Sequence, residues 1–179
     1  MKKHPIIVIA GPTAVGKTDV AVEVARETGA EIVSCDAMMV YREPEIIVNK
    51  PSRAVLDEIQ HHMIGVVSVT ENYDVARFRT EAEDVIRRIY PSKNLVLTGG
   101  SGLYIRALLD GLFEGPGADP VLRQQLLEAE EHSPGILFSQ LAGVDPVQAQ
   151  RIGPGNIRRI VRALEVFRRS GVPMSELQA

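Results

Sequence analysis

The sequence predicts an α/β fold, in which a parallel sheet is flanked by helices, followed by an all-helical segment towards the C-terminus. Short apolar runs alternate with segments of helical periodicity in the N-terminal part, and the pattern beyond residue 117 is helical alone. Glycine-rich turns follow the first apolar run and a later one. Because 45% of the 179 residues are hydrophobic, the chain can build a substantial core.

Strands and helices alternate along the N-terminal part, which is the order of a parallel sheet with crossover helices. Runs that are apolar throughout predict buried parallel strands, whereas apolar positions every three or four residues predict helices. The expected elements are strands at Ile6–Ala10, Glu31–Cys35 and Asn94–Thr98, and helices at Lys17–Thr28, Asp74–Tyr90 and Leu103–Leu109, with a short helix around Ser52–Gln60.

A cluster of glycine and proline marks the clearest boundary in the chain. Gly111, Gly115, Pro116, Gly117 and Pro120 fall within ten residues. We therefore expect an α/β core over residues 1–116 and a helical segment over residues 117–179. The helices expected in that segment are Pro120–Glu131, Ile136–Leu141, Pro146–Ile152 and Asn156–Arg169.

The turn after the first strand has the spacing of a phosphate-binding loop: a glycine, four residues, and then Gly-Lys-Thr. The glycines let backbone N–H groups point at phosphate oxygens. Lys17 adds a mobile positive charge, and the Thr18 hydroxyl is placed to ligate Mg²⁺. The sequence therefore predicts a P-loop NTPase-like sheet that binds a polyphosphate such as ATP. The loop consists of Gly11, Pro12, Thr13, Ala14, Val15, Gly16, Lys17 and Thr18.

Asp36 follows the second predicted strand, at the edge of the sheet where open α/β folds bind their ligands. A carboxylate there can accept a substrate proton or hold Mg²⁺ through a water molecule. The alternative is a residue that only caps the next turn. Thr98–Gly102 ends the third strand, either as a second oxyanion-binding turn or as glycines that let a helix pack closely on the sheet.

The histidine pair and the single cysteine have simpler interpretations. His61 and His62 lack the cysteine or carboxylate cluster of a metal site, so we expect them to be structural or to hydrogen-bond a substrate. Cys35 is expected to be a small buried residue, because no base is evident beside it. A lone cysteine suits a reducing cytosol. No apolar run approaches the roughly 20 residues of a membrane span, and residues 1–5 lack the pattern of a secretory signal, so we expect a cytoplasmic protein.

Charge is distributed unevenly along the chain. Residues 151–179 carry six arginines against Glu165 and Glu176, whereas the whole chain has a net charge of −3. A basic segment on an acidic body predicts either a polyanionic partner or solvated helix faces. Arg158 and Arg162 lie one turn apart on the last expected helix, a spacing that suits successive phosphates of a nucleic acid.

Four stretches together resemble the N-terminal part of the tRNA dimethylallyltransferases, also called tRNA isopentenyltransferases or IPP transferases. They are Gly11–Thr18, Ser34–Arg42, Gly99–Tyr104 and Arg158–Val166, in the family's order. The resemblance implies transfer of a dimethylallyl group from dimethylallyl diphosphate to N6 of adenosine-37, in tRNAs that read codons beginning with U. It also implies that the protein binds the anticodon stem-loop of tRNA, and we expect a monomer.

The same resemblance implies roles for individual residues. The phosphate loop would hold the diphosphate leaving group with Mg²⁺ on its oxygens, and Lys17 and Thr18 would stabilise the charge that develops there. Asp36 would accept a proton from the adenine amine. The helical segment after Gly117 would be the family's inserted domain, closing over the anticodon stem-loop. The residues expected to contact tRNA are Asp36, Ala37, Met38, Met39, Ser101, Arg123, Arg158, Arg159, Ile160, Val161 and Arg162.

The chain departs from the family's pattern at several positions. Ala37, Met39 and Ser101 stand where the family usually has Ser, Gln and Thr, and residues 43–49 lack the family's glycines. Two other functions stay open. A small-molecule or nucleotide kinase also pairs a phosphate loop with an acidic residue after the second strand, although no lid with paired arginines is evident. The second is a non-catalytic remnant that binds tRNA or a nucleotide.

Overall fold

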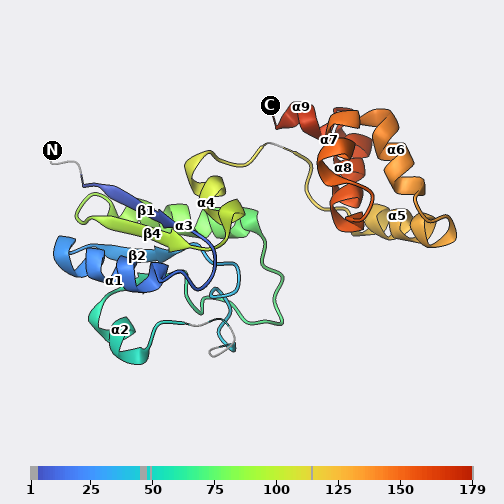
Figure 1. Ribbon diagram of the computed structural model, residues 1–179. Helices are drawn as coiled ribbons and strands as arrows, with labels where there is room; N and C mark the ends of the chain where they lie inside the picture. Colours follow the sequence, from blue (N-terminus) through green and yellow to red (C-terminus); the bar gives the residue numbers. More distant parts are fainter. Residues whose placement is uncertain (1–3, 45–47, 49, 114, 179) are drawn as a thin grey trace. The chain divides into compact units, whose positions relative to one another are not determined.

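The computed structural model describes residues 4–44, 48, 50–113 and 115–178. The chain divides into two compact units, Met1–Leu112 and Phe113–Ala179 (Figure 1). Every strand that the structure describes lies in the first unit, and the described elements of the second unit are helices. In the described part of the chain, no helix is long and apolar enough to span a membrane.

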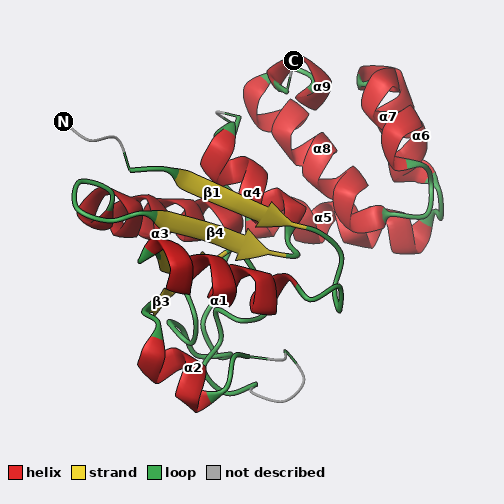
Figure 2. Cartoon of the chain, turned by 60° about the vertical axis from the view of Figure 1, so that its left-hand side comes forward, coloured by secondary structure: helices red, strands yellow, loops and turns green. Residues whose placement is uncertain are grey.

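The first unit is built on a four-stranded parallel sheet with the strand order β1-β4-β2-β3. The sheet confirms the predicted α/β class, and β1 and β4 run in the same direction in Figure 2. The shortest strand was not expected, because two residues show no periodicity. The strands are β1 (Ile6–Ala10), β2 (Glu31–Ser34), β3 (His61–His62) and β4 (Leu95–Gly99).

Helices cover both faces of the sheet, and alternate residues of each strand point to opposite faces. In β4, Val96 packs with the residues of α1, whereas Leu95 and Leu97 pack with Phe78 of α3. Phe78 also stacks on Tyr104 of α4, with ring centroids 4.1 Å apart, and so joins the two helices of that face. The helices of this unit are α1 (Lys17–Thr28), α2 (Arg53–Glu58), α3 (Val75–Ile89) and α4 (Gly102–Leu109).

β1 differs from the buried strand that its sequence predicts. Ile6 is 42% exposed and Val8 is 38% exposed, whereas Ile7 and Ile9 pack against the α1 side of the sheet. The expectation of full burial is wrong because β1 is the edge strand and pairs with β4 on one side. Edge position depends on the pairing of distant segments, which an apolar run does not reveal.

The second unit packs its helices around one apolar core, formed by buried residues such as Leu126, Leu141 and Leu164. Two of its helices begin with an aspartate cap followed by proline, a combination that favours the start of a helix. Asp119 accepts a hydrogen bond from the Leu122 N–H, and Asp145 accepts one from the Gln148 N–H. The helices are α5 (Pro120–His132), α6 (Ile136–Val144), α7 (Pro146–Ile152), α8 (Ile157–Ser170) and α9 (Met174–Leu177).

Candidate functional site

The phosphate loop connects the end of β1 to the start of α1. Gly16 has φ of 82° and Ala14 has φ of 67°, so the backbone turns through left-handed conformations just before the helix. Gly16 suits such a conformation because it has no β-carbon. The Lys17 ammonium donates a hydrogen bond to the Pro12 carbonyl oxygen. Its positive charge therefore lies over the loop, beside the N-terminus of α1, where an anion is favoured.

Asp36 lies one residue beyond the buried Cys35, at the carboxyl end of β2. Its Oδ1 accepts hydrogen bonds from the backbone N–H groups of Met38 and Met39, at 2.8 and 3.3 Å. Oδ1 thus caps the following turn. Among the hydrogen bonds of the described residues, none involves Oδ2. One carboxylate oxygen therefore fixes the local backbone while the other stays available for chemistry.

The turn after β4 is joined directly to the turn that carries Asp36. The Ser101 hydroxyl accepts a hydrogen bond from the Ala37 N–H at 2.8 Å, and the Ser101 N–H donates to the Cys35 carbonyl at 3.3 Å. A β-carbon added to Gly99 would lie 2.2 Å from that same carbonyl oxygen. The glycine therefore permits a close approach between the backbone at the end of β4 and the backbone after β2, a contact that neither sequence interpretation of these glycines had named.

Gly100 marks the place where the three turns meet. A β-carbon added there would lie 3.8 Å from the Asp36 Oδ2, from the Gly11 carbonyl oxygen and from the Thr13 hydroxyl. These atoms belong to the phosphate loop and to the turn after β2, so the structure brings together the two elements that the sequence assigned to one site. The carboxyl edge of a parallel sheet produces this convergence.

A cavity of about 780 Å³ opens at this edge of the sheet. Oxygen donors of the kind that Mg²⁺ prefers line it, including the Thr18 hydroxyl and the Asp36 carboxylate. These residues therefore fit the metal that the resemblance implies. The other side of the cavity is more apolar and comes from Met39, Val48, Pro51, Val55 and Ile64. The departures from the family's pattern at residues 45–47 and 49 lie outside the described residues.

Backbone pairing holds the segment after Asp36 in place. The Val67 N–H donates to the Val40 carbonyl at 3.1 Å, and the Arg42 N–H donates to the Val67 carbonyl at 2.9 Å. The Arg42 side chain adds two bonds, from Nε to the Gly65 carbonyl and from Nη2 to the Val66 carbonyl. Residues 39–42 are therefore fixed to residues 65–67 rather than left as a free loop.

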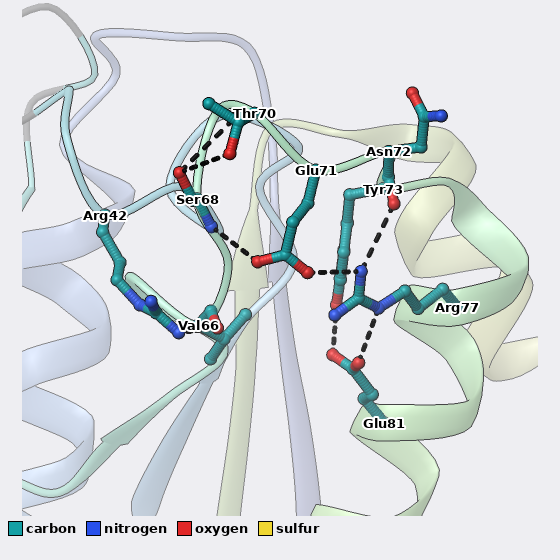
Figure 3. Close-up of polar contacts among 9 residues, drawn as sticks. All are labelled: Arg42, Val66, Ser68, Thr70, Glu71, Asn72, Tyr73, Arg77 and Glu81. Atoms are coloured by element: carbon teal, nitrogen blue, oxygen red, sulfur yellow. Dashed lines mark hydrogen bonds and ion pairs between the residues drawn. The ribbon is translucent and has the colours of Figure 1, made fainter.

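A polar network anchors the next segment to the start of α3 (Figure 3). Arg77 bonds to Glu71 and Glu81, and its guanidinium lies 4.9 Å from the centre of the Tyr73 ring. Glu71 accepts a hydrogen bond from the Ser68 N–H, and Tyr73 donates to Glu81. The network ties residues 68–73 to a rigid helix, and through the neighbouring pairing it supports the backbone beside Asp36.

The histidines and the cysteine make local contacts. His61 Nδ1 hydrogen-bonds the Ile59 carbonyl at 2.7 Å, and His62 Nε2 bonds Glu31 at 2.7 Å. No group of three or more His, Cys, Asp or Glu side chains that could hold a metal ion occurs among the described residues. Cys35 is fully buried, as expected. Burial, with a smaller effect from the Asp36 charge, raises the pKa of its thiol to about 12.

The arginines expected to bind RNA fall into two groups in the second unit. Arg158 and Arg159 are exposed near the start of α8. Arg123 and Arg162 instead form ion pairs with the carboxylate of Glu165. Two apolar residues from the same expected set, Ile160 and Val161, are buried in the core of this unit, so their side chains do not face a ligand.

Glu165 was not among the expected site residues. Its position carries a signal, because it lies four residues after Val161 and one after Leu164, within the apolar stripe of α8. A charged residue in such a stripe is rarely buried without a partner. Arg162, three residues before Glu165 on the same helix, is a partner that the spacing suggests. Arg123 lies on a different helix, so its pairing with Glu165 is not evident from the sequence.

Comparisons with known proteins agree with the motifs. The family model described as IPP transferase matches residues 39–179. A tRNA dimethylallyltransferase from Pelotomaculum thermopropionicum is 43% identical over 99% of this chain and 57% of its own length. A crystal structure of tRNA isopentenylpyrophosphate transferase from Bacillus halodurans has a TM-score of 0.60 at 34% identity, covering 96% of this chain and 57% of that one.

A second set of crystal structures, of a eukaryotic dimethylallyltransferase acting on tRNA, superposes more closely. Its TM-score is 0.74 at 30% identity, and the match covers 98% of this chain and 44% of that one. The chain therefore spans a little over half the length of the curated relative and of the bacterial enzyme, and less of the eukaryotic one.

Proposed function

Because the chain belongs to the IPP transferase family, we propose that it acts in tRNA modification in the cytoplasm. The reaction transfers a dimethylallyl group from dimethylallyl diphosphate to N6 of adenosine-37, in tRNAs that read codons beginning with U. One observation carries this proposal. The Oδ2 of Asp36 and the phosphate loop meet at Gly100, so the carboxylate that we propose as the proton acceptor and the loop that we propose to hold the diphosphate line one cavity.

The phosphate loop holds the leaving group in this proposal. Backbone N–H groups of residues 13–18, at the N-terminus of α1, face the diphosphate, and Lys17 adds a positive charge. As the bond between the allylic carbon and the diphosphate oxygen breaks, negative charge grows on that oxygen. A cation held over the loop stabilises this charge more in the transition state than in the substrate.

Asp36 serves as the proton acceptor. The N6 amine of adenine attacks the allylic carbon, a C–N bond forms, and the diphosphate departs with the electrons of the broken C–O bond. The proton lost from N6 passes to Asp36 Oδ2, the oxygen that the turn leaves available. The Ser101 hydroxyl supports the step indirectly, because it holds the Ala37 N–H and with it the turn.

Thr18, with Asp36 acting through water, would hold Mg²⁺. The metal would neutralise charge on the diphosphate oxygens. The target base has to leave the anticodon stack to reach the cavity, as it does in other enzymes that modify bases. The exposed Arg158 and Arg159 of the second unit are suited to the phosphates of the anticodon stem-loop.

The names of the relatives support tRNA prenylation over the kinase alternative. The test is to incubate the 179-residue chain with dimethylallyl diphosphate, Mg²⁺ and an anticodon stem-loop RNA whose target adenosine is flanked by adenosines. Mass spectrometry then detects the added isoprenoid and locates it on the RNA. A stem-loop with guanosine at the target position is the matched control.

We expect addition to the adenosine RNA and none to the guanosine RNA. Binding of RNA without any product would support the non-catalytic remnant. Phosphoryl transfer from ATP to a small acceptor, without any need for tRNA, would instead support the kinase.

A further inference from the structure

Among the described residues of the second unit, Glu165 carries the most deeply buried charge. Its side chain is 0% exposed, and it accepts four hydrogen bonds. Arg123 provides two of them, from Nε at 2.8 Å and Nη2 at 2.9 Å, in a bidentate pair. Arg162 Nη1 and the Asp119 N–H provide the others. One carboxylate therefore joins α5, α8 and the start of the helical segment.

Glu165 stays ionised at neutral pH. Burial on its own would raise the pKa of this carboxyl group, but hydrogen bonds from Arg123, Asp119 and Arg162 outweigh burial and lower the pKa to about 2. The carboxylate therefore keeps its negative charge at neutral pH, and both guanidinium groups donate charge-assisted hydrogen bonds to it.

Arg123 and Arg162 both remain partly exposed while they bind Glu165. Their side chains are 40% and 30% exposed, for Arg123 and Arg162 respectively. Within the described part of the chain, Arg123 Nη1 and Arg162 Nε donate to no acceptor. Arg123 is thus anchored through Nε and Nη2, and Arg162 through Nη1 and Nη2, and each guanidinium keeps one nitrogen without a partner among the described residues. Two cations sharing one anion leave a net positive charge.

Further arginines extend this charge along α8. Arg162 Nη2 donates to the Pro116 carbonyl at 2.9 Å, and Arg169 Nη1 donates to the Gly117 carbonyl at 2.6 Å. Both side chains therefore lie on the side of α8 that faces residues 116–117. Arg158 lies one turn before Arg162 and belongs to the same side. The spacing of this row suits successive phosphates rather than a single small anion.

We propose that Glu165 is a positioning residue for RNA binding, which holds Arg123 and Arg162 as a preorganised guanidinium pair facing the phosphate backbone. The inference rests on the proposed function, because it takes RNA as the polyanion. Holding the forks in place before binding lowers the entropy lost when a phosphate is contacted. Stability alone does not call for this arrangement, since a buried ion pair is often replaceable by apolar residues without loss.

The test compares two variants that remove the same negative charge from the second unit. Glu165→Gln releases the arginines, whereas Glu176→Gln removes an exposed carboxylate of α9 and leaves the guanidinium pair intact. Affinity for an anticodon stem-loop RNA is measured over a series of salt concentrations. Circular dichroism at the same temperature reports whether each variant is folded.

The two possible roles of Glu165, joining helices only or positioning the arginines, predict opposite changes in the RNA affinity of Glu165→Gln. If Glu165 is merely structural, the folded Glu165→Gln chain gains net positive charge and binds RNA as tightly as the Glu176→Gln chain, or more tightly. We expect instead that Glu165→Gln binds at least about five-fold more weakly and has a shallower salt dependence, because fewer phosphates are neutralised. Equal or tighter binding by Glu165→Gln overturns the proposal.

A second pair of variants covers the case in which Glu165→Gln does not fold. Arg123→Lys keeps the positive charge but loses the bidentate fork, and Arg151→Lys makes the same change at an exposed position of α7. We expect weaker RNA binding for Arg123→Lys alone, and equal binding by the two variants overturns the proposal. A wild-type chain that fails to bind RNA overturns both this inference and the proposed tRNA partner, whereas a wild-type chain that binds RNA leaves only the inference at risk.

Discussion

Gly99 and Cys35 approach each other more closely than any residue with a side chain would allow. A β-carbon on Gly99 would lie 2.2 Å from the Cys35 carbonyl oxygen and 2.9 Å from its Cα. The contact joins the end of β4 to the end of β2, directly before Asp36. The position of the proposed proton acceptor therefore depends on a glycine in a neighbouring strand.

Gly99→Ala is expected to destabilise the first unit. The added methyl group forces the two backbones apart, and overpacking of this kind costs about 1–3 kcal/mol. Denaturant unfolding measures the change. Gly102→Ala is the control, because a β-carbon there meets no atom within 4 Å and alanine favours the helix in which it lies. Equal stability of the two variants would contradict the geometry.

Ser101→Ala is expected to lower turnover several-fold while the protein remains folded. The variant removes the hydroxyl that accepts the Ala37 N–H at 2.8 Å, so the turn at Asp36 loosens by the loss of one hydrogen bond. Steady-state kinetics of prenyl transfer check this. Ser101→Thr keeps the hydroxyl and should restore turnover, whereas Ser92→Ala, three residues beyond the end of α3, should have no effect.

Lys17→Ala is expected to weaken binding of dimethylallyl diphosphate. A hydrogen bond between charged groups contributes about 1.5–3 kcal/mol, which corresponds to roughly a 10- to 100-fold loss of affinity. Isothermal titration calorimetry in the presence of Mg²⁺ measures it. Lys93→Ala removes a lysine just before β4, where it pairs with Glu31 far from the phosphate loop, and should bind the diphosphate normally. Unchanged diphosphate affinity in Lys17→Ala would show that Lys17 does not contribute to the binding site.

Acid is expected to destabilise the second unit through Glu165. Its folded pKa is about 2, below the ordinary value of 4.5, so the stabilisation is complete above pH 4.5 and is lost as the pH falls towards 2. At neutral pH it is on the order of 3 kcal/mol. Between pH 7 and pH 3, the free energy of unfolding should fall less in Glu165→Gln than in the wild type.

Protonation of Asp145 at low pH is also expected to lower the stability of the second unit. Burial raises the pKa of its carboxyl group, but hydrogen bonds from Ser175 and Gln148 outweigh burial and lower it. Some pH dependence should therefore survive in Glu165→Gln. Glu176→Gln should keep the full wild-type dependence, and an identical acid response in all three proteins would contradict the assignment to Glu165.

Local signals made much of the fold predictable. Aspartate followed by proline set the start of α5 and of α7, and the glycine spacing set the loop between β1 and α1. Caps and phosphate loops depend on a few neighbouring residues, so the sequence contains nearly all the information that determines them. The parallel sheet followed from the alternation of these elements.

Non-local contacts made the rest unpredictable. The exposure of Ile6 and Val8 depends on β1 lying at the edge of the sheet. The side-chain bonds of Arg42 to residues 65 and 66 span more than twenty positions, and the pair between Arg123 and Glu165 spans 42. No periodicity or spacing encodes such partners, so the pairing of Arg123 with Glu165 emerged from the structure alone.

Asp36 is proposed to act as the proton acceptor beside the diphosphate site. The most direct test measures two quantities for Asp36→Asn, the rate of prenyl transfer to the stem-loop and the affinity for dimethylallyl diphosphate. Asparagine keeps the size and an oxygen acceptor for the turn but does not take up the proton. We predict a turnover about 10²- to 10⁴-fold lower, with a much smaller change in diphosphate affinity because the phosphate loop and Thr18 still hold the diphosphate and its metal. Equal losses of turnover and affinity, or full turnover, would contradict the claim.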